Sequence, residues 1–261
     1  RVELESLGLA TLYGDTDSIF AKFGGEVTFH DPKNPDCECT GCVLKAHLNG
    51  YYPKLLIDRW GFSPERAKLI EIGFEEVYDT IFFGESKKKY AGWAHGAVKP
   101  EIVGFELIRS DWCKLAKEVQ KRVIEMRLKK EPKDAIKSYL VTVKNDLLDG
   151  KLNEKLIVSK GLMKSLKEYG KRKPVQGSKQ TAVVKGKIEP SKFTLPPHVR
   201  AAEKAGIKSG RIHYVFASAP KGGSMVAEPV TDFEKIPPID MSGLVYYWRH
   251  QIFPPTERVL W

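Results

Sequence analysis

The chain has 261 residues, a formal net charge of +10 at pH 7 and an isoelectric point near 9.3. This length is enough for one large domain or two modest ones, each with a buried core. The basic excess favours a polyanionic partner, although membranes and acidic proteins also attract basic chains. No apolar run approaches the ~20 residues that span a bilayer, and no signal peptide is evident, so we expect a soluble, cytoplasmic protein with no membrane partner.

The first residues, RVELESLGL, have the pattern of a helix that is about to end. Gly8 stands where a left-handed residue commonly terminates a helix. Because a self-contained domain rarely begins within a helix, we expect a fragment or one half of a split polypeptide.

Residues 9–23 are predicted to form a strand, a tight turn and a second strand. The turn is Gly14-Asp15-Thr16-Asp17. Residues 24–42 contain several glycines and prolines and are predicted to be a loop. Short helical pieces are expected over 43–70, one of them capped at Ser63-Pro64.

Residues 70–83 are rich in β-branched and aromatic types, which predicts an extended strand. After about residue 92 the pattern becomes mainly helical, with apolar stripes opposite basic faces. Helices are predicted over 111–130, 133–149, 160–169, 197–204 and 241–253, and a strand over 212–217. The basic segment 170–192 has few large apolar residues, which predicts a mobile loop or an ordinary solvated surface segment.

Three of the four cysteines are close together, at Cys37, Cys39 and Cys42, with His30 and His47 nearby. Such a cluster is typical of a small zinc site or a redox pair. Structural zinc usually takes two separated pairs of ligands, because the chain must wrap a tetrahedron. The spacing here argues against zinc and favours ordinary turn cysteines or a disulfide.

The turn within residues 9–23 carries the most informative motif, Tyr13-Gly14-Asp15-Thr16-Asp17-Ser18. A hairpin places both carboxylates at the exposed tip of a rigid sheet, where their oxygens can bind a hard divalent cation such as Mg²⁺. Two such ions, ~3.5–4 Å apart, activate an attacking hydroxyl and stabilise the leaving group in phosphoryl transfer. By itself an Asp-x-Asp pair is common in ordinary turns, where aspartate caps its own backbone.

The context of the turn distinguishes it from an ordinary one. An apolar strand, YGDTDS and a second apolar strand together resemble motif C of family B DNA polymerases. Downstream, Lys87-Lys88-Lys89-Tyr90-Ala91-Gly92 resembles the KKRY element at the border of the palm and thumb. The segment GFELIRSDW at 104–112 resembles the entry into the thumb, and Tyr246-Tyr247 to Leu260 resembles the helix near its end. The resemblance covers nearly the whole chain, in order.

The resemblance implies an α+β fold, in which a partial palm is followed by a mainly helical thumb. The palm part, residues 1–92, has an antiparallel sheet with the motif C hairpin and an insertion around 24–70. The thumb part, residues 93–261, binds duplex DNA. Asp17 matches the aspartate that binds the catalytic Mg²⁺ ions directly, and Asp15 matches its neighbour, which supports the site electrostatically.

Other site residues follow from the same resemblance. Glu75 falls at the position of an accessory active-site carboxylate that binds metal, with a plain surface residue as the alternative. Lys88 and Tyr90 match the pair that contacts the primer–template minor groove. A lysine there can donate to acceptors present on every base pair and so sense duplex shape without reading sequence. Lys87, Lys89 and Arg109 are further candidate DNA contacts, although a basic run is also common on a solvated surface.

We find no counterpart of the family's motif A, which carries the other principal metal-binding aspartate, nor of its fingers helix or 3′–5′ exonuclease motifs. The resemblance therefore implies a catalytic fragment or subunit of a DNA-directed DNA polymerase, inert alone and active with an amino-terminal chain that supplies those parts. Its expected partners are primer–template DNA, deoxynucleoside triphosphates and that chain, in the nucleoid. The alternative is a non-catalytic subunit that binds duplex DNA. A different two-metal enzyme is disfavoured by the KKKYAG and thumb-entry matches.

Overall fold

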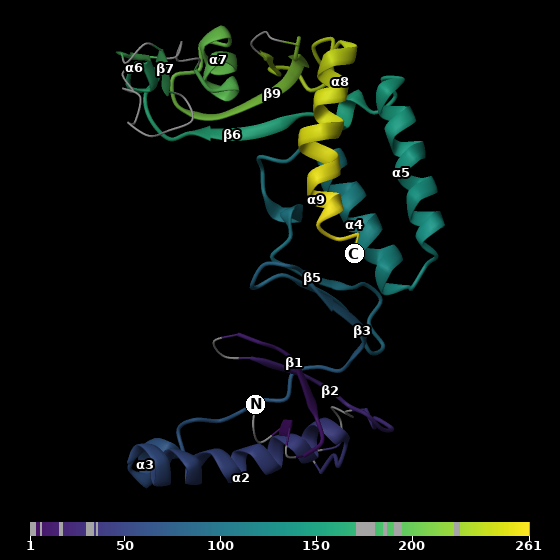
Figure 1. Ribbon diagram of the computed structural model, residues 1–261, viewed down its shortest axis with the longest axis vertical. Helices are drawn as coiled ribbons and strands as arrows, with labels where there is room; N and C mark the ends of the chain where they lie inside the picture. Colours follow the sequence, from purple (N-terminus) through teal and green to yellow (C-terminus); the bar gives the residue numbers. More distant parts are fainter. Residues whose placement is uncertain are drawn as a thin grey trace. The chain divides into compact units, whose positions relative to one another are not determined.

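The computed structural model describes residues 4–5, 7–15, 18–29, 34, 36–170, 181–184, 187–190, 195–221 and 225–260. The chain divides into two compact units, Arg1–Gly104 and Phe105–Trp261 (Figure 1). All strand pairings in the described part are antiparallel, and helices and strands are mixed, which confirms the predicted α+β class.

Unit 1 contains the hairpin that the sequence predicts. Strand β1 (Ala10–Gly14) pairs with β2 (Ile19–Lys22) in a two-stranded sheet. Ahead of it, Gly8 has a left-handed backbone with φ of 76°, and its N–H donates to the Glu5 carbonyl at 3.0 Å. The predicted helix end at Gly8 is therefore confirmed.

The second sheet of unit 1 has the order β3-β4-β5, formed by β3 (Tyr78–Phe83), β4 (Tyr90–Ala94) and β5 (Glu101–Val103). The domain boundary expected after residue 92 would cut through β4. The units divide after Gly104 instead, because β4 and β5 belong to one sheet with β3.

The prediction of a strand over 70–83 is wrong for its first half, because β3 begins at Tyr78. The preceding backbone is bound to a helix instead. Asn49 receives the Ile72 N–H on its Oδ1 at 2.8 Å and donates its Nδ2 to the Ile72 carbonyl at 2.9 Å. One side chain thus occupies both backbone groups of Ile72, the groups that a strand would use for its ladder.

That helix, α2 (Thr40–Trp60), is a single 21-residue element where the sequence predicts a loop and short pieces. Only Gly41, Leu48 and Leu56 of this helix are buried. The sequence therefore has no apolar stripe from which the helix could be predicted. The helix accommodates Pro53 and ends at Gly61, whose left-handed backbone has φ of 66°. The next helix, α3 (Pro64–Ala67), begins as predicted, with the Ser63 hydroxyl accepting from the Arg66 N–H.

Unit 2 begins with the short turn η1 (Glu106–Ile108) and two helices, α4 (Lys114–Leu128) and α5 (Lys133–Leu148), close to the two predicted ones. Three apolar residues of α4 are fully buried: Val119, Val123 and Ile124. The last predicted helix is divided into α8 (Met241–Tyr247), a π-helical segment η3 (Trp248–Ile252) and α9 (Phe253–Glu257). Helix α9 packs against α4 (Figure 1).

A three-stranded sheet completes unit 2, with β6 (Val158–Leu162), β9 (Gly210–Ser218) and β10 (Val226–Pro229) in the order β10-β9-β6. Helix α7 (Pro197–Lys204) packs on β9 and β10 and has the predicted bounds. The predicted helix over 160–169 is wrong at its start, because β6 pairs with β9 through Leu162. Only α6 (Leu166–Gly170) is helical there, and the turn η2 (Asn153–Lys155) precedes β6.

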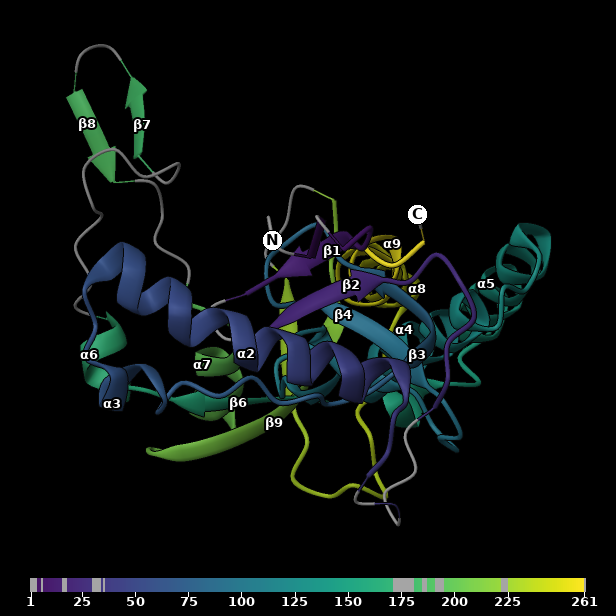
Figure 2. The ribbon, with the colours of Figure 1, turned by 90° about the horizontal axis from the view of Figure 1, so that it is seen from below.

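Within the basic segment 170–192, strands β7 (Thr181–Val184) and β8 (Lys187–Pro190) form a hairpin (Figure 2). The prediction of a loop is wrong for these two strands. Most of the other residues of the segment lie outside the described part of the chain. None of the described helices has the length and apolar character needed to cross a membrane.

A buried polar network joins the beginning and the end of unit 2. Glu106, 3% exposed, accepts from Gln120 Nε2 at 2.8 Å and from the Arg258 guanidinium. Gln120 is fully buried and also donates to the Pro255 carbonyl at 2.7 Å. The turn η1 is thereby tied to α4 and to the chain around α9.

We predict that Glu106→Ala lowers the free energy of unfolding of unit 2 by about 2–3 kcal/mol, measured by urea denaturation. Hydrogen bonds to a charged group contribute about 1.5–3 kcal/mol, and the variant leaves buried Gln120 without this acceptor. In the control, Glu118→Ala removes ion pairs of an exposed carboxylate and costs at most about 1 kcal/mol. Equal losses in the two variants would contradict the role of the network.

His198 makes unit 2 sensitive to acid. It is 6% exposed on α7, and burial, followed by the charge of Lys160, lowers its pKa from 6.5 to about 4. The unfolded chain therefore takes up a proton before the folded one as the pH falls. We predict that the free energy of unfolding is highest above pH 6.5 and falls by up to about 3 kcal/mol as pH drops through the interval to pH 4. In urea titrations at a series of pH values, His198→Gln removes this dependence of the free energy of unfolding on pH. The control His250→Gln retains it. An unchanged pH dependence in His198→Gln contradicts the assignment.

Candidate active site

The turn between β1 and β2 presents Asp15. Its N–H donates to the Ser18 carbonyl at 2.9 Å, which closes the turn, and its side chain is 24% exposed. Asp17, the predicted direct metal ligand, lies with Thr16 outside the described residues. Its role therefore stays a prediction.

Lys88, in the turn between β3 and β4, lies against this hairpin. Its N–H donates to Tyr13 Oη at 2.8 Å, and its Nζ is 3.5 Å from Asp15 Oδ2. Two of the predicted site residues, Asp15 and Lys88, are thus brought together from distant parts of the sequence. The Lys88 side chain is 69% exposed, so this ion pair contributes at most about 1 kcal/mol to stability.

The backbone of Lys88 is strained. Its φ is 63°, in the left-handed region that residues with a Cβ rarely adopt. Gly104, with φ of 75°, makes room for it, since a Cβ at position 104 would lie 2.0 Å from the Lys88 carbonyl oxygen. Left-handed backbone costs roughly 1–3 kcal/mol, more than the exposed ion pair repays. The hydrogen bond from the Lys88 N–H to Tyr13 offsets part of this cost.

An aromatic cluster packs the hairpin onto the second sheet of unit 1. Tyr13 stacks on Phe83 with ring centroids 5.0 Å apart, and Phe20 lies 5.1 Å from Tyr90 and 5.3 Å from Phe83. Such pairs contribute about 0.5–1.5 kcal/mol each beyond the area that they bury. The cluster therefore holds β1 and β2 in a defined position relative to the Lys88 turn.

Glu101 on β5 organises two tyrosines of this sheet. Tyr90 Oη donates to Glu101 Oε1 at 3.1 Å, and Tyr78 Oη donates to Oε2. Burial, followed by the bond to Glu101, raises the pKa of Tyr90 to about 12 and that of Tyr78 still further. Both phenols are therefore neutral donors at physiological pH. Sequence reasoning missed Glu101, because only the pairing of β4 with β5 brings it to the tyrosines.

The other predicted site residues lie at different places in the fold. Glu75 is exposed and lies before β3 rather than on a strand, and its charge makes a small contribution to the raised pKa of Tyr90. Lys87 is exposed and Lys89 partly buried. Arg109 belongs to unit 2, where its Nε and Nη2 donate to the Asp111 carboxylate at 3.0 and 2.7 Å. This pair holds the pKa of Asp111 below its usual range.

The three clustered cysteines lie at the beginning of α2. Their sulfur atoms are all within 4.8 Å of one another, and among the described residues no other three histidine, cysteine or acidic side chains form such a group. None of the three forms a disulfide, although the spacing allowed one. A hydrogen bond with Cys39, together with burial, raises the pKa of Cys42 to about 11. His47 is not part of the cluster, and His30 lies outside the described residues.

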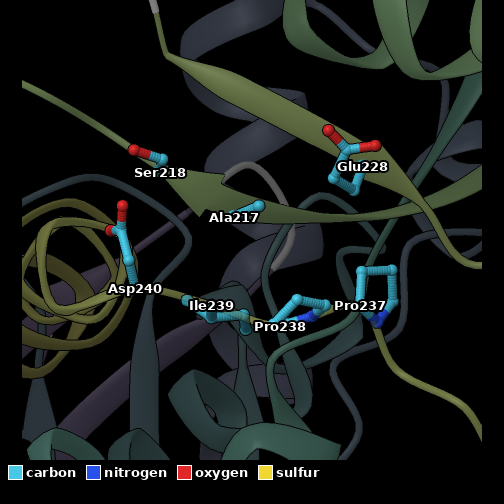
Figure 3. A pocket seen from close by; sticks show the side chains of 7 residues that line it. All are labelled: Ala217, Ser218, Glu228, Pro237, Pro238, Ile239 and Asp240. Atoms are coloured by element: carbon cyan, nitrogen blue, oxygen red, sulfur yellow. The ribbon is translucent and has the colours of Figure 1, made fainter.

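Unit 2 has an open pocket of about 500 Å³ beside β9 and β10 (Figure 3). Asp240 and Glu228, which line the pocket, bond to other residues of unit 2. Asp240 caps α8, accepting from the Gly243 N–H at 2.9 Å and from the Ser242 hydroxyl at 2.6 Å, which lowers the pKa of Asp240 to about 2. Glu228 pairs with Lys204. We therefore base no function on this pocket.

We predict that Glu101→Gln lowers the pKa of Tyr90 from about 12 toward its ordinary value of 10 without reaching it. The amide carries no negative charge to favour the protonated phenol, whereas the larger effect, burial, remains. The measurement is a pH titration of tyrosine ionisation by ultraviolet absorbance, with Tyr90→Phe identifying the Tyr90 contribution. Asp79→Asn, on neighbouring β3, is the control and leaves the titration unchanged. An unaltered pKa in Glu101→Gln contradicts the hydrogen-bonding arrangement.

Several known proteins are similar to this chain in sequence and in fold. A family model described as DNA polymerase family B matches residues 63–260, more than half of the chain. A DNA polymerase of Archaeoglobus fulgidus is 30% identical over 279 residues, covering 98% of this chain and 29% of the relative. DNA polymerase II of Escherichia coli is 26% identical over 215 residues, covering 77% of this chain and 22% of the relative.

A solved structure, the family B DNA polymerase of the archaeon Pyrobaculum calidifontis, matches with a TM-score of 0.59 and 26% identity. The match covers 99% of this chain and 27% of that one, so the chain spans between a fifth and a third of the length of these proteins. The family match begins after the hairpin, but the Archaeoglobus alignment covers nearly all residues and therefore includes it. By its match to the family model and its alignment with these relatives, the chain belongs to DNA polymerase family B.

Proposed function

We propose that this chain is a carboxy-terminal palm-and-thumb part of a DNA-directed DNA polymerase, which adds deoxynucleotides to a primer 3′ end. The observation that carries the proposal is the contact of Lys88 with Asp15 and Tyr13 at the tip of the β1–β2 hairpin. It joins a candidate metal-binding carboxylate to a candidate DNA-contacting lysine. Unit 1 is then the palm part, and unit 2 the thumb.

Asp15 and Asp17 are the residues that we propose for binding Mg²⁺. Their carboxylate oxygens are the hard ligands that this ion takes, and the Asp15 side chain is partly exposed next to a cation, so the chemistry of the donor set fits. When bound, the metal stabilises the charge that develops on the transferred phosphoryl group. Asp15 and Lys88 carry opposite charges, with Lys88 Nζ 3.5 Å from Asp15 Oδ2. Glu75 is proposed as an accessory carboxylate near Tyr90.

Lys88 is proposed to contact the primer–template. Its exposed ammonium can donate to minor-groove acceptors that every base pair presents, so it would sense duplex shape. Tyr90 is proposed to support it from the adjacent strand, with its hydroxyl oriented by Glu101. Lys87, Lys89 and, in unit 2, Arg109 are proposed as further phosphate contacts. Such contacts release counterions, so we expect duplex affinity to fall steeply with salt.

A second polypeptide segment is proposed to complete the site. No three carboxylates form a metal-binding group among the described residues, and a two-metal site needs more ligands than one hairpin supplies. Leu12 and Ile19 are 47% and 48% exposed on β1 and β2, and each of these strands has an open edge in the described sheet. Open edges and exposed apolar residues favour a covering partner. We propose an amino-terminal chain carrying motif A, the fingers and the exonuclease.

The test is Mg²⁺-dependent primer extension by this chain alone and mixed with the matching amino-terminal polymerase portion. We predict extension only on mixing. Asp17→Ala lowers the rate by roughly 10²–10³-fold or more, the loss expected when a group that stabilises transition-state charge is removed. Its duplex affinity is unchanged. Asp79→Ala, an exposed aspartate of the same unit, is the matched control and retains activity.

Three outcomes would contradict parts of this proposal. Robust extension by the chain alone removes the need for a partner. A mixture that is inactive although the chain binds duplex in a salt-sensitive way supports the non-catalytic alternative. Loss of both activity and duplex binding in Asp17→Ala points to a structural role for the turn.

A further inference from the structure

The three cysteines at the beginning of α2 have the geometry of a metal site. The sulfur atoms of Cys37, Cys39 and Cys42 lie within 4.8 Å of one another. Three thiolates around a tetrahedral zinc ion are ~3.8 Å apart, because each Zn–S bond is about 2.3 Å long. The sulfurs therefore need to approach one another by no more than about 1 Å to share one ion.

The first turn of α2 brings the three cysteines close together. Cys39 is the N-cap residue of α2, and its Sγ accepts from the Cys42 N–H at 3.4 Å. This capping turn directs both side chains to the same end of the helix, and Cys37 arrives from the loop two residues earlier. The sequence-based argument against zinc, the lack of two separated ligand pairs, therefore does not apply, because one capped turn presents three ligands.

The surrounding contacts hold this turn in place. Thr28 and Thr40 exchange hydrogen bonds, each hydroxyl accepting from the other residue's N–H, at 2.9 and 3.0 Å. On the other side, the Phe74 ring covers Gly41 so closely that a Cβ there would lie 2.3 Å from it. A ligand set that is already ordered loses little conformational freedom when it binds an ion.

We propose that Cys37, Cys39 and Cys42 bind one Zn²⁺ ion as three thiolates, with the fourth position taken by another ligand. Each thiol gives its proton to solvent on binding, so affinity falls as the pH is lowered. Soft thiolates select zinc rather than magnesium, so this site is chemically distinct from the carboxylates proposed for Mg²⁺. The cluster also precedes Ser63, where the family match begins, so the inference does not rest on the polymerase proposal. The ion fixes the loop to the first turn of α2.

The test measures metal in the full 261-residue chain, purified in a reducing buffer without chelator. We expect about one zinc per chain, and on Co²⁺ substitution the thiolate-to-cobalt charge-transfer bands of a tetrahedral site. Cys39→Ser is the diagnostic variant, because serine is a good N-cap and preserves the helix start but is a poor soft-metal ligand. Its Zn²⁺ affinity should fall by more than about 100-fold, since even an outer-shell change costs about 10–100-fold.

The matched control is Cys113→Ala, which removes a buried cysteine of unit 2 and should retain both the zinc and the cobalt spectrum. Circular dichroism confirms that each variant is folded. The proposal is overturned if the unmodified chain takes up neither Zn²⁺ nor Co²⁺ under reducing conditions. It is also overturned if folded Cys39→Ser binds them as tightly as the unmodified chain.

Discussion

The contact between the Lys88 turn and the β1–β2 hairpin is the constraint on which the candidate site depends. Lys88 bonds through its backbone to Tyr13 and through its ammonium to Asp15, and it does so in a strained, left-handed conformation. Aromatic packing behind the hairpin and the missing side chain at Gly104 make this geometry possible. The backbone bond to Tyr13, rather than the exposed ion pair, stabilises this turn, since exposed ion pairs contribute little.

Elements with local signals could be predicted from the sequence. The hairpin of β1 and β2, the cap at Ser63 and the helix α7 each follow from turn residues, capping residues or apolar periodicity. Helix α2 could not, because its buried residues form no stripe and it is held by the two bonds of Asn49 to Ile72. The sequence predicts helix where β6 lies, since its ladder partner β9 comes about fifty residues later in the chain.

The candidate site shows the same division. The motifs of the sequence pointed to Asp15 and Lys88, and the fold brings them into contact, although their catalytic roles stay predictions. Glu101 had no local signal, because its contact with Tyr78 and Tyr90 depends on the register of three strands. Motif spacing likewise did not show that the sulfur atoms of Cys37, Cys39 and Cys42 lie close together. Whether these three sulfurs converge depends on where α2 begins, and that boundary was not evident from composition.

The central claim is that a primer 3′ end is held against the β1–β2 turn and the Lys88 turn of unit 1. Photo-crosslinking from a reactive nucleotide at the primer 3′ end tests this most directly, in a mixture of this chain, the amino-terminal polymerase portion and a template, with Ca²⁺ replacing Mg²⁺ to prevent extension. Mass spectrometry then locates the labelled peptides. The account predicts labelling around residues 13–22 and 84–90. Labelling confined to unit 2, or none on this chain, would contradict it.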